Sequence, residues 1–252
     1  MYPLVQIGPL RLGSSGLALL LSLLLGNWLL GRIARARGGP LLAAQADRCF
    51  LPVILGAVVG GRLWYGFFNW DLYGRTPGLF RALRVGDLAW SGAVLGGLLA
   101  GYLWCRLRRL DLDSVADSAA LALPLPQALA SLGLLLSGEA FGTPTTLPWA
   151  VSLFGASRHP TQVYFALAAL ASLMILRRVA RHNVSAGSLM ATFLGLQGLS
   201  LLVVEALRAD SLLLPGGIRA AQVVGLTLML FAMHRLRHLA LGAGHTVAAT
   251  HG

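Results

Sequence analysis

The sequence predicts an all-α integral membrane protein, a bundle of seven transmembrane helices with a small head loop on the outer side. Three observations predict this class: 56% of the 252 residues are hydrophobic, only 12% are charged, and the mean hydropathy is +0.72. A water-soluble domain carries about twice that share of charge. We expect one membrane domain over residues 1–240, because the chain is too short for a large soluble domain beside it.

A helix needs about 20 mainly apolar residues to cross a bilayer. Seven segments meet this requirement, at about 13–31, 51–70, 87–105, 115–137, 161–176, 187–207 and 218–236. The fourth contains Pro124 and Pro126, which lack backbone donors, so we expect a break or kink there. Residues 241–252 show no periodic apolar face and are expected to form a disordered tail on the inner side.

All twenty basic residues are arginines, and the net charge is +11. On a soluble chain this charge would suggest nucleic acid. Here the arginines cluster at the ends of apolar segments, where they contact lipid headgroups, so nucleic acid is excluded as a partner. The loops on one side hold twelve arginines and those on the other hold seven. The positive-inside rule then places the N-terminus outside and the C-terminus inside.

Three ionisable residues, Arg62, Glu139 and Glu205, lie in or beside apolar segments. A charge in the bilayer costs from about 2.5 kcal/mol upward, so each marks a candidate site. The planar guanidinium of Arg62 suits a phosphate or a carboxylate. Arg208 follows Glu205 by three residues, so the two can pair on a helix. The alternative is structural, with Arg62 neutralised by Glu139 or Glu205 to hold helices together.

A loop rich in proline, glycine and threonine covers residues 138–162. Loops of this length in compact proteins are usually functional. Four polar or aromatic residues gather where the loop meets the next helix: Arg158, His159, Gln162 and Tyr164. An exposed helix start with an added arginine attracts anions. A plain helix cap with an interfacial tyrosine is the alternative.

The two cysteines, Cys49 and Cys105, show no paired spacing typical of a metal or redox site. We therefore interpret them as small buried hydrophobic residues rather than nucleophiles. No metal and no cofactor is expected.

Four motifs follow one another along the chain: "GGRLWYGFF" (60–68), "SGEAFG" (137–142), "RHPTQVY" (158–164) and "VEALR" (204–208). In order and spacing they resemble the prolipoprotein diacylglyceryl transferases, over about residues 7–238. The resemblance implies a seven-helix bundle in the bacterial inner membrane with its site facing the periplasm. Enzymes of this family attach the diacylglyceryl group of phosphatidylglycerol to the cysteine thiol of a lipoprotein signal sequence and release glycerol phosphate.

The residues and the resemblance together give a candidate phospholipid-binding set. Its members are Arg62, Glu139, Arg158, His159, Gln162, Tyr164, Glu205 and Arg208. If the chain is active, Glu139, His159 and Glu205 are the candidate catalytic residues.

The chain departs from the family pattern at positions that serve the chemistry. Transfer needs help in deprotonating a thiol and cations for the departing phosphate. The family tyrosine, histidine, arginine, two asparagines, glutamate and second arginine are replaced by Ser15, Ser91, Ser131, Leu134, Ser137, Phe165 and Leu201. One charge-assisted contact is worth about 1.5 to 3 kcal/mol, so losing several lowers the rate by orders of magnitude.

Two functions therefore remain open. The first is a catalytically impaired paralogue that binds an anionic phospholipid, phosphatidylglycerol, as a lipid-binding or scaffolding subunit beside other transmembrane subunits. The second is an active phosphatidylglycerol-prolipoprotein diacylglyceryl transferase, or a related phospholipid-using transferase, with a rearranged site. A channel or transporter is disfavoured, because the sequence shows neither an inverted repeat nor an acidic ring.

Overall fold

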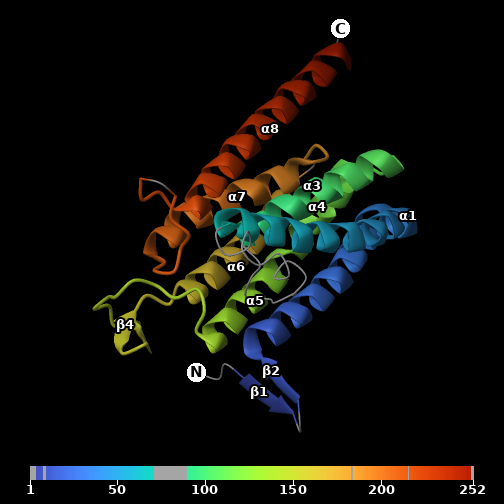
Figure 1. Cartoon of the computed structure of the whole chain (residues 1–252). Helices are drawn as coiled ribbons and strands as arrows, with labels where there is room; N and C mark the ends of the chain where they lie inside the picture. Colours follow the sequence, from blue (N-terminus) through green and yellow to red (C-terminus); the bar gives the residue numbers. More distant parts are fainter. Residues whose placement is uncertain (1–3, 8–9, 71–89, 183, 215, 251–252) are drawn as a thin grey trace. The chain divides into compact units, whose positions relative to one another are not determined.

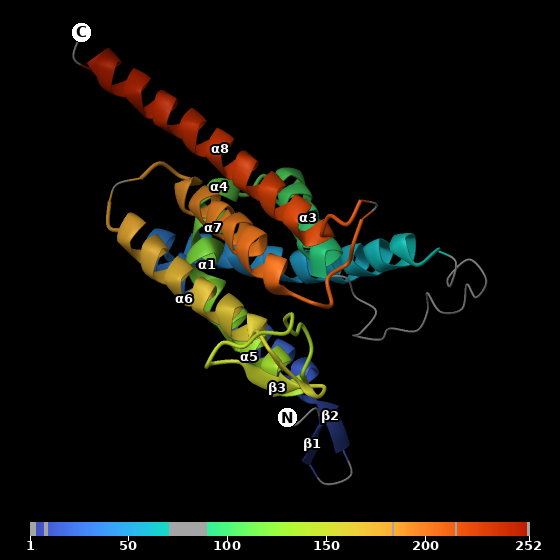
Figure 2. The ribbon, with the colours of Figure 1, turned by 90° about the vertical axis from the view of Figure 1, so that its left-hand side faces the viewer.

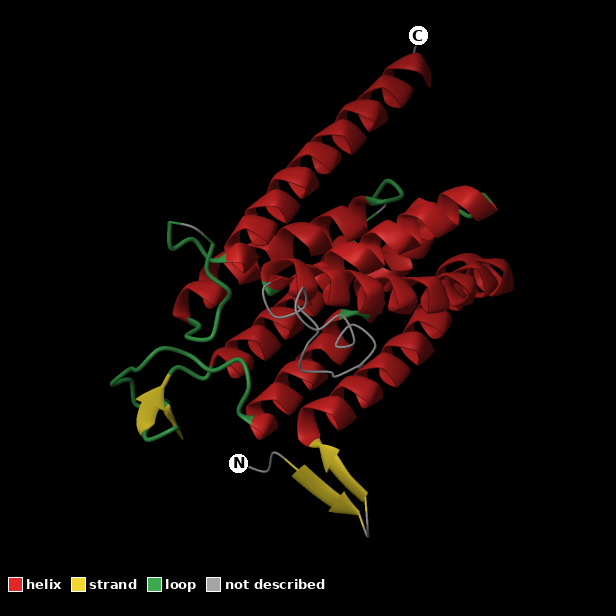
Figure 3. Ribbon diagram, viewed as in Figure 1, coloured by secondary structure: helices red, strands yellow, loops and turns green. Residues whose placement is uncertain are grey.

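The structure is a computed structural model that describes residues 4–7, 10–70, 90–182, 184–214 and 216–250. Most of these residues are helical, and the named strands among them form two short hairpins (Figure 3). The chain groups into two compact units. The first unit combines residues 1–33 with 116–252, and the second covers residues 34–115. The expectation of one membrane domain stays a prediction.

The first strand pair leads directly into a long helix. Strands β1 (Leu4–Ile7) and β2 (Leu10–Gly13) pair antiparallel, and α1 (Ser14–Phe68) follows at once. The helix is interrupted at Gly39, whose φ of 70° is one that glycine adopts without strain. The predicted spans 13–31 and 51–70 thus fall in α1 over residues 14–31 and 51–68, and residues 32–50 between them are helical apart from this break.

The prediction of a break at the prolines is confirmed. Helices α4 (Leu112–Ala122) and α5 (Pro124–Ser137) meet at a bend of 45°. Both prolines lie in the first turn of α5, where a missing N–H leaves no helical hydrogen bond unmade. The predicted fourth span therefore consists of two helices.

Three further helices complete the first unit: α6 (Thr161–Val179), α7 (Ser188–Val204), which ends in the 3-10 turn η3 (Glu205–Leu207), and α8 (Ala220–Thr250). Helix α6 packs against α5 and α7, and α7 packs against α8 (Figures 1 and 2). The structure continues α8 as helix over residues 241–250, where the sequence predicts a disordered tail. No proline interrupts this run, so the helix can extend from the apolar segment.

A buried carboxylate orders the start of α7. Gly187, the residue before the helix, has no side chain with which to cap it. Asp117 of α4 instead accepts hydrogen bonds from the backbone N–H groups of Gly187 (3.0 Å) and Met190 (2.9 Å). These N–H groups belong to the helix end that lacks intrahelical partners. Asp117 thereby ties α4 to α7.

The second unit contains the remainder of α1 and helix α3 (Trp90–Arg108). The two helices touch through glycines: a Cβ on Gly60 would lie 2.4 Å from the carbonyl oxygen of Gly92 and 2.7 Å from Cα of Gly96. Such contacts are typical of helix pairs in membranes. Residues 87–89 of the predicted third span lie outside the described residues.

Among the described residues, three helices are long and apolar enough to cross a membrane: α1, α6, and α7 continued through η3. The bent pair α4–α5 raises this number to four if it forms one span. The protein is thus a largely helical chain with several apolar helices. Seven spans and an outside N-terminus stay predictions.

Candidate functional site

Two segments of the first unit meet beyond the ends of α5 and α7. We call residues 138–164 and 205–219 together the outer site. Backbone hydrogen bonds join them, from Thr143 N to Leu207 O (2.8 Å) and from Ala209 N to Phe141 O (2.9 Å). Gly142 allows the first segment to fold closely on itself, because a Cβ there would lie 2.4 Å from the carbonyl oxygen of His159. Within the first segment, β3 (Val151–Leu153) and β4 (Ala156–Arg158) form a hairpin.

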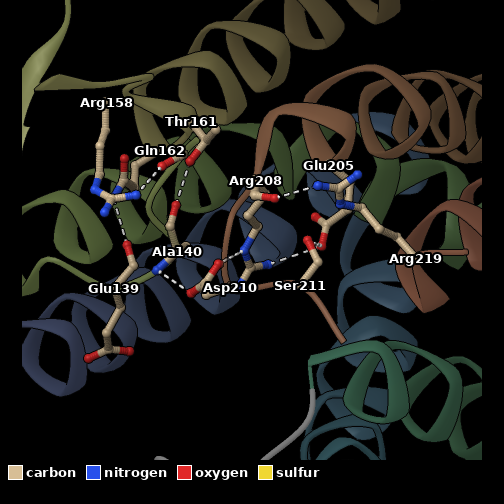
Figure 4. Close-up of polar contacts among 11 residues, drawn as sticks. Glu139, Ala140, Arg158, Thr161, Gln162, Glu205, Arg208, Asp210, Ser211 and Arg219 are labelled. Atoms are coloured by element: carbon tan, nitrogen blue, oxygen red, sulfur yellow. Dashed lines mark hydrogen bonds and ion pairs between the residues drawn. The ribbon is translucent and has the colours of Figure 1, made fainter. Parts of the chain in front are cut away.

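A chain of charged side chains lies in the second segment (Figure 4). Glu205 is only 1% exposed, and its Oε1 lies 3.5 Å from Arg208 Nη1. Arg208 Nε also donates to Asp210 Oδ1 at 2.6 Å. Ser211 Oγ donates to Glu205 Oε1 at 2.9 Å. The predicted pairing of Glu205 with Arg208 is confirmed.

The guanidinium of Arg208 stays charged at physiological pH. Burial acts to lower the pKa of Arg208, but the hydrogen bond to Asp210 and the charges of Glu205 and Asp210 raise it above its ordinary value. Asp210 Oδ2 further accepts a hydrogen bond from Ala140 N at 3.1 Å, which links the two segments of the outer site. Sequence reasoning missed Asp210 and Ser211, because the turn after η3 has no periodicity from which to infer their direction.

Arg158 holds the first segment together. Its Nε donates to Leu153 O (3.2 Å) and its Nη1 to Gly142 O (3.3 Å). The guanidinium carbon also lies 5.1 Å from the ring centre of Phe141. The predicted anion-binding arginine is therefore engaged with backbone carbonyls and an aromatic ring.

His159 belongs to a row of aromatic polar groups. Tyr164 OH accepts a hydrogen bond from Trp149 Nε1 (2.8 Å) and lies 3.3 Å from His159 Nδ1. An indole N–H can only donate, so the proton of Tyr164 remains available for Nδ1. When Tyr164 donates it, neutral His159 carries its own proton on Nε2 and has no free lone pair on either ring nitrogen. This arrangement does not favour His159 as a base.

Gln162 and Glu139 have separate roles. Gln162 is fully buried, and its Nε2 donates to the backbone carbonyl of Glu139 at 2.6 Å. The Glu139 carboxylate is exposed and accepts a hydrogen bond from Ser15 Oγ at 2.9 Å. Figure 4 shows this carboxylate pointing away from Glu205. The structure therefore does not bring the two glutamate carboxylates together, and Arg62, which is buried in the second unit, keeps its role as a prediction.

Two of the positions that depart from the resemblance carry hydroxyls that donate within their own helix. Ser131 Oγ donates to Gln127 O (2.9 Å), and Ser137 Oγ donates to Leu134 O (3.1 Å). Leu201 is buried in the core. The Ser91 side chain lies outside those that the structure describes. Across the described residues, no three histidines, cysteines or acidic residues are grouped so as to hold a metal ion.

Sequence comparison places the chain among known proteins. Residues 3–236 match the family described as prolipoprotein diacylglyceryl transferase. A phosphatidylglycerol-prolipoprotein diacylglyceryl transferase of Synechococcus elongatus is 33% identical over 246 residues, which cover 91% of this chain and 84% of the relative. Its counterpart in Trichormus variabilis is 32% identical over 89% of this chain and 84% of the relative. This chain therefore belongs to the prolipoprotein diacylglyceryl transferase family.

Proposed function

We propose that this family member binds an anionic phospholipid at its outer site, facing the periplasm of a bacterial inner membrane, and that its transferase chemistry is impaired. Its role is that of a lipid-binding or scaffolding subunit beside other transmembrane subunits. The relatives are named for phosphatidylglycerol, which makes this lipid the first one to test. For Arg62, which is buried in the second unit, phospholipid binding is a separate prediction.

One observation supports the proposal that the transferase chemistry is impaired. The arginine and histidine side chains of the outer site that could take part in the reaction are engaged with protein groups. Arg158 donates to two carbonyls, Arg208 pairs with Asp210, and the Nδ1 of His159 faces the Tyr164 hydroxyl. A general base must reach the proton that it removes, and a developing phosphate charge needs donors that are aimed at it.

The transfer reaction needs a base and a cation that three of the substituted positions do not supply. In the transfer, the thiol sulfur forms a bond to the terminal glyceryl carbon, the carbon–oxygen bond to phosphate breaks, and the thiol proton passes to a base. Ser131 and Ser137 carry hydroxyls that donate to their own helix, and Leu201 carries no polar group. These three positions can supply neither a base of suitable pKa nor a cation.

The second candidate is an active transferase with a rearranged site. It is favoured by the names of the relatives and by the presence of Glu139, His159 and Glu205. In that case the exposed Glu139 carboxylate, hydrogen-bonded to Ser15, is the most accessible base.

Two measurements on the same purified protein separate the two candidates. Purified protein in detergent is incubated with radiolabelled phosphatidylglycerol and a lipobox peptide, with the Trichormus variabilis relative as the active control. We expect retained phosphatidylglycerol in native mass spectra and no labelled peptide. Labelled peptide formed at a rate near that of the control would establish the transferase, whereas failure to retain phosphatidylglycerol over phosphatidylcholine would overturn lipid binding.

A further inference from the structure

The three arginines of the outer site differ in how their donors are used. Arg158 donates hydrogen bonds to two backbone carbonyls, and Arg208 pairs with the carboxylates of Asp210 and Glu205. Arg219 makes one side-chain hydrogen bond within the described residues, from Nη2 to the carbonyl oxygen of Arg208 at 2.8 Å. Arg219 differs from the other two in its Nε, which is buried and has no hydrogen-bond partner among the described residues.

A tight turn delivers Arg219 to this place. Gly216 and Gly217 have φ values of 88° and 78°, a conformation that glycine adopts without strain. They let the chain fold back so that Leu214 N donates to Ile218 O (2.8 Å). The backbones of Leu213 and Arg219 form an isolated antiparallel β-bridge. Helix α8 then begins at Ala220. The position of Arg219 is thus fixed from both sides by backbone hydrogen bonds.

Two buried atoms beside this turn have complementary needs. Within the described part of the chain, Arg219 Nε and Glu205 Oε2 are buried and make no hydrogen bond. Figure 4 shows the Arg219 guanidinium reaching from the start of α8 to the Glu205–Arg208 pair. Buried polar atoms in native proteins nearly always have partners, so the unpartnered donor of Arg219 and the unpartnered acceptor of Glu205 both call for an explanation. A ligand that carries both an anionic oxygen and a hydroxyl group would satisfy both atoms.

We propose that Arg219 binds the phosphate of a lipid headgroup, and that Glu205 accepts a hydrogen bond from a hydroxyl of the same headgroup. The inference rests on the proposed lipid-binding function and names the residue that selects the headgroup. A phosphodiester with a hydroxylated alcohol fits this donor and acceptor pair. A choline headgroup does not, because it offers no hydroxyl for the carboxylate.

The test measures binding of phosphatidylglycerol and phosphatidylcholine to detergent-solubilised wild type, Arg219→Gln, Arg219→Lys and Arg181→Gln. Arg181 is an exposed arginine beyond the far end of α6 and serves as the matched charge control. We expect Arg219→Gln to weaken phosphatidylglycerol binding about tenfold or more, as loss of a charge-assisted hydrogen bond does. Arg219→Lys keeps the charge without the planar fork and should lie between the two. Arg181→Gln should bind as wild type.

The outcomes separate this inference from the proposed function. Wild-type protein without a preference for phosphatidylglycerol would overturn both. A preference that persists unchanged in Arg219→Gln and Arg219→Lys would overturn the role of Arg219 alone. Displacement of the lipid by equimolar inorganic phosphate would assign the site to free phosphate and overturn the lipid headgroup. If Arg219→Gln does not fold, the comparison of Arg219→Lys with wild type decides the question.

Discussion

At the crossing of α1 and α3 the backbones meet at Gly60 and Gly96 with no side chain between them. In the outer site, by contrast, the close contacts join polar side chains to backbone groups, as Arg158 does with Gly142 and Gln162 does with Glu139. Packing in the first region depends on residues without a side chain, and packing in the second depends on side chains that form hydrogen bonds.

The difference follows from the surroundings of the two regions. Helix α1 is among the helices long and apolar enough to cross a membrane, and between helices in hydrocarbon the hydrophobic effect supplies no attraction, so close packing of small residues must do so. The loop of the outer site has no continuous helix to satisfy its N–H and C=O groups, and side chains must do so. A substitution that adds one methyl group should therefore damage the crossing, and one that removes a donor should damage the outer site.

The largest effect is expected from Arg208→Gln. It leaves the buried Glu205 without its cation, and breaking a buried pair in this way costs about 3–5 kcal/mol in the free energy of unfolding. The double variant Arg208→Gln/Glu205→Gln should recover most of the loss, which thermal and SDS unfolding would measure. Arg177→Gln, at an exposed position on α6, is the control. Additive losses in the double variant would show that the pair is not coupled.

The next effect is a matched pair on α1. Gly60→Ala places its Cβ against the backbone of α3 and should cost about 1–3 kcal/mol, the usual range for overpacking. Gly31→Ala meets no atom within 4 Å, so it should raise stability by about 0.5–1 kcal/mol through helix propensity alone. Thermal unfolding in one detergent would compare them. Equal shifts of the same sign would contradict the close crossing.

A smaller and local effect is expected from Arg158→Gln. It removes two hydrogen bonds to carbonyls that lie within the loop of the outer site, so the loss falls on local opening of the loop rather than on global unfolding. The amides of Thr145 and His159, which donate to Ser157 and Thr143, should then exchange faster with deuterium. Amides in the middle of α7 should keep their protection in the same experiment. Unchanged exchange in the loop would mean that the hairpin holds without Arg158.

Helix breaks and side-chain pairs within one helix were predictable from the sequence. Contacts between residues that a turn or a helix crossing brings together were not. The bend at Pro124 follows from the chemistry of one residue, and the pairing of Glu205 with Arg208 follows from helical spacing. Asp210 lies two residues beyond Arg208 in an irregular turn, where spacing gives no direction for a side chain. Likewise, Cys49 and Cys105 are distant in sequence, yet their sulfur atoms lie 3.2 Å apart in the second unit. Only the helix crossing brings them together.

The "RHPTQVY" motif shows the same limit of sequence-based prediction. The motif indicates an anion site through Arg158 and His159, but the structure directs both side chains to protein partners. Trp149, which fixes Tyr164, lies in the middle of the loop with no motif around it. Sequence patterns identified some residues of the outer site but not Asp210, Ser211 or Trp149, and the loop fold determines which of their atoms remain available.

The smallest effect is expected from Tyr164→Phe, which removes the hydroxyl between Trp149 and His159. A neutral hydrogen bond contributes about 0.5–1.5 kcal/mol, and here the group is partly exposed, so the lower end applies. Trp149→Phe should cost a similar amount, and the double variant should cost no more than Tyr164→Phe alone, because each single variant removes the bond between Trp149 and Tyr164. Thermal unfolding of the four proteins measures this cycle. Independent, additive losses would mean that the indole and the phenol are not paired, and the proton of Tyr164 would then no longer be assigned to His159.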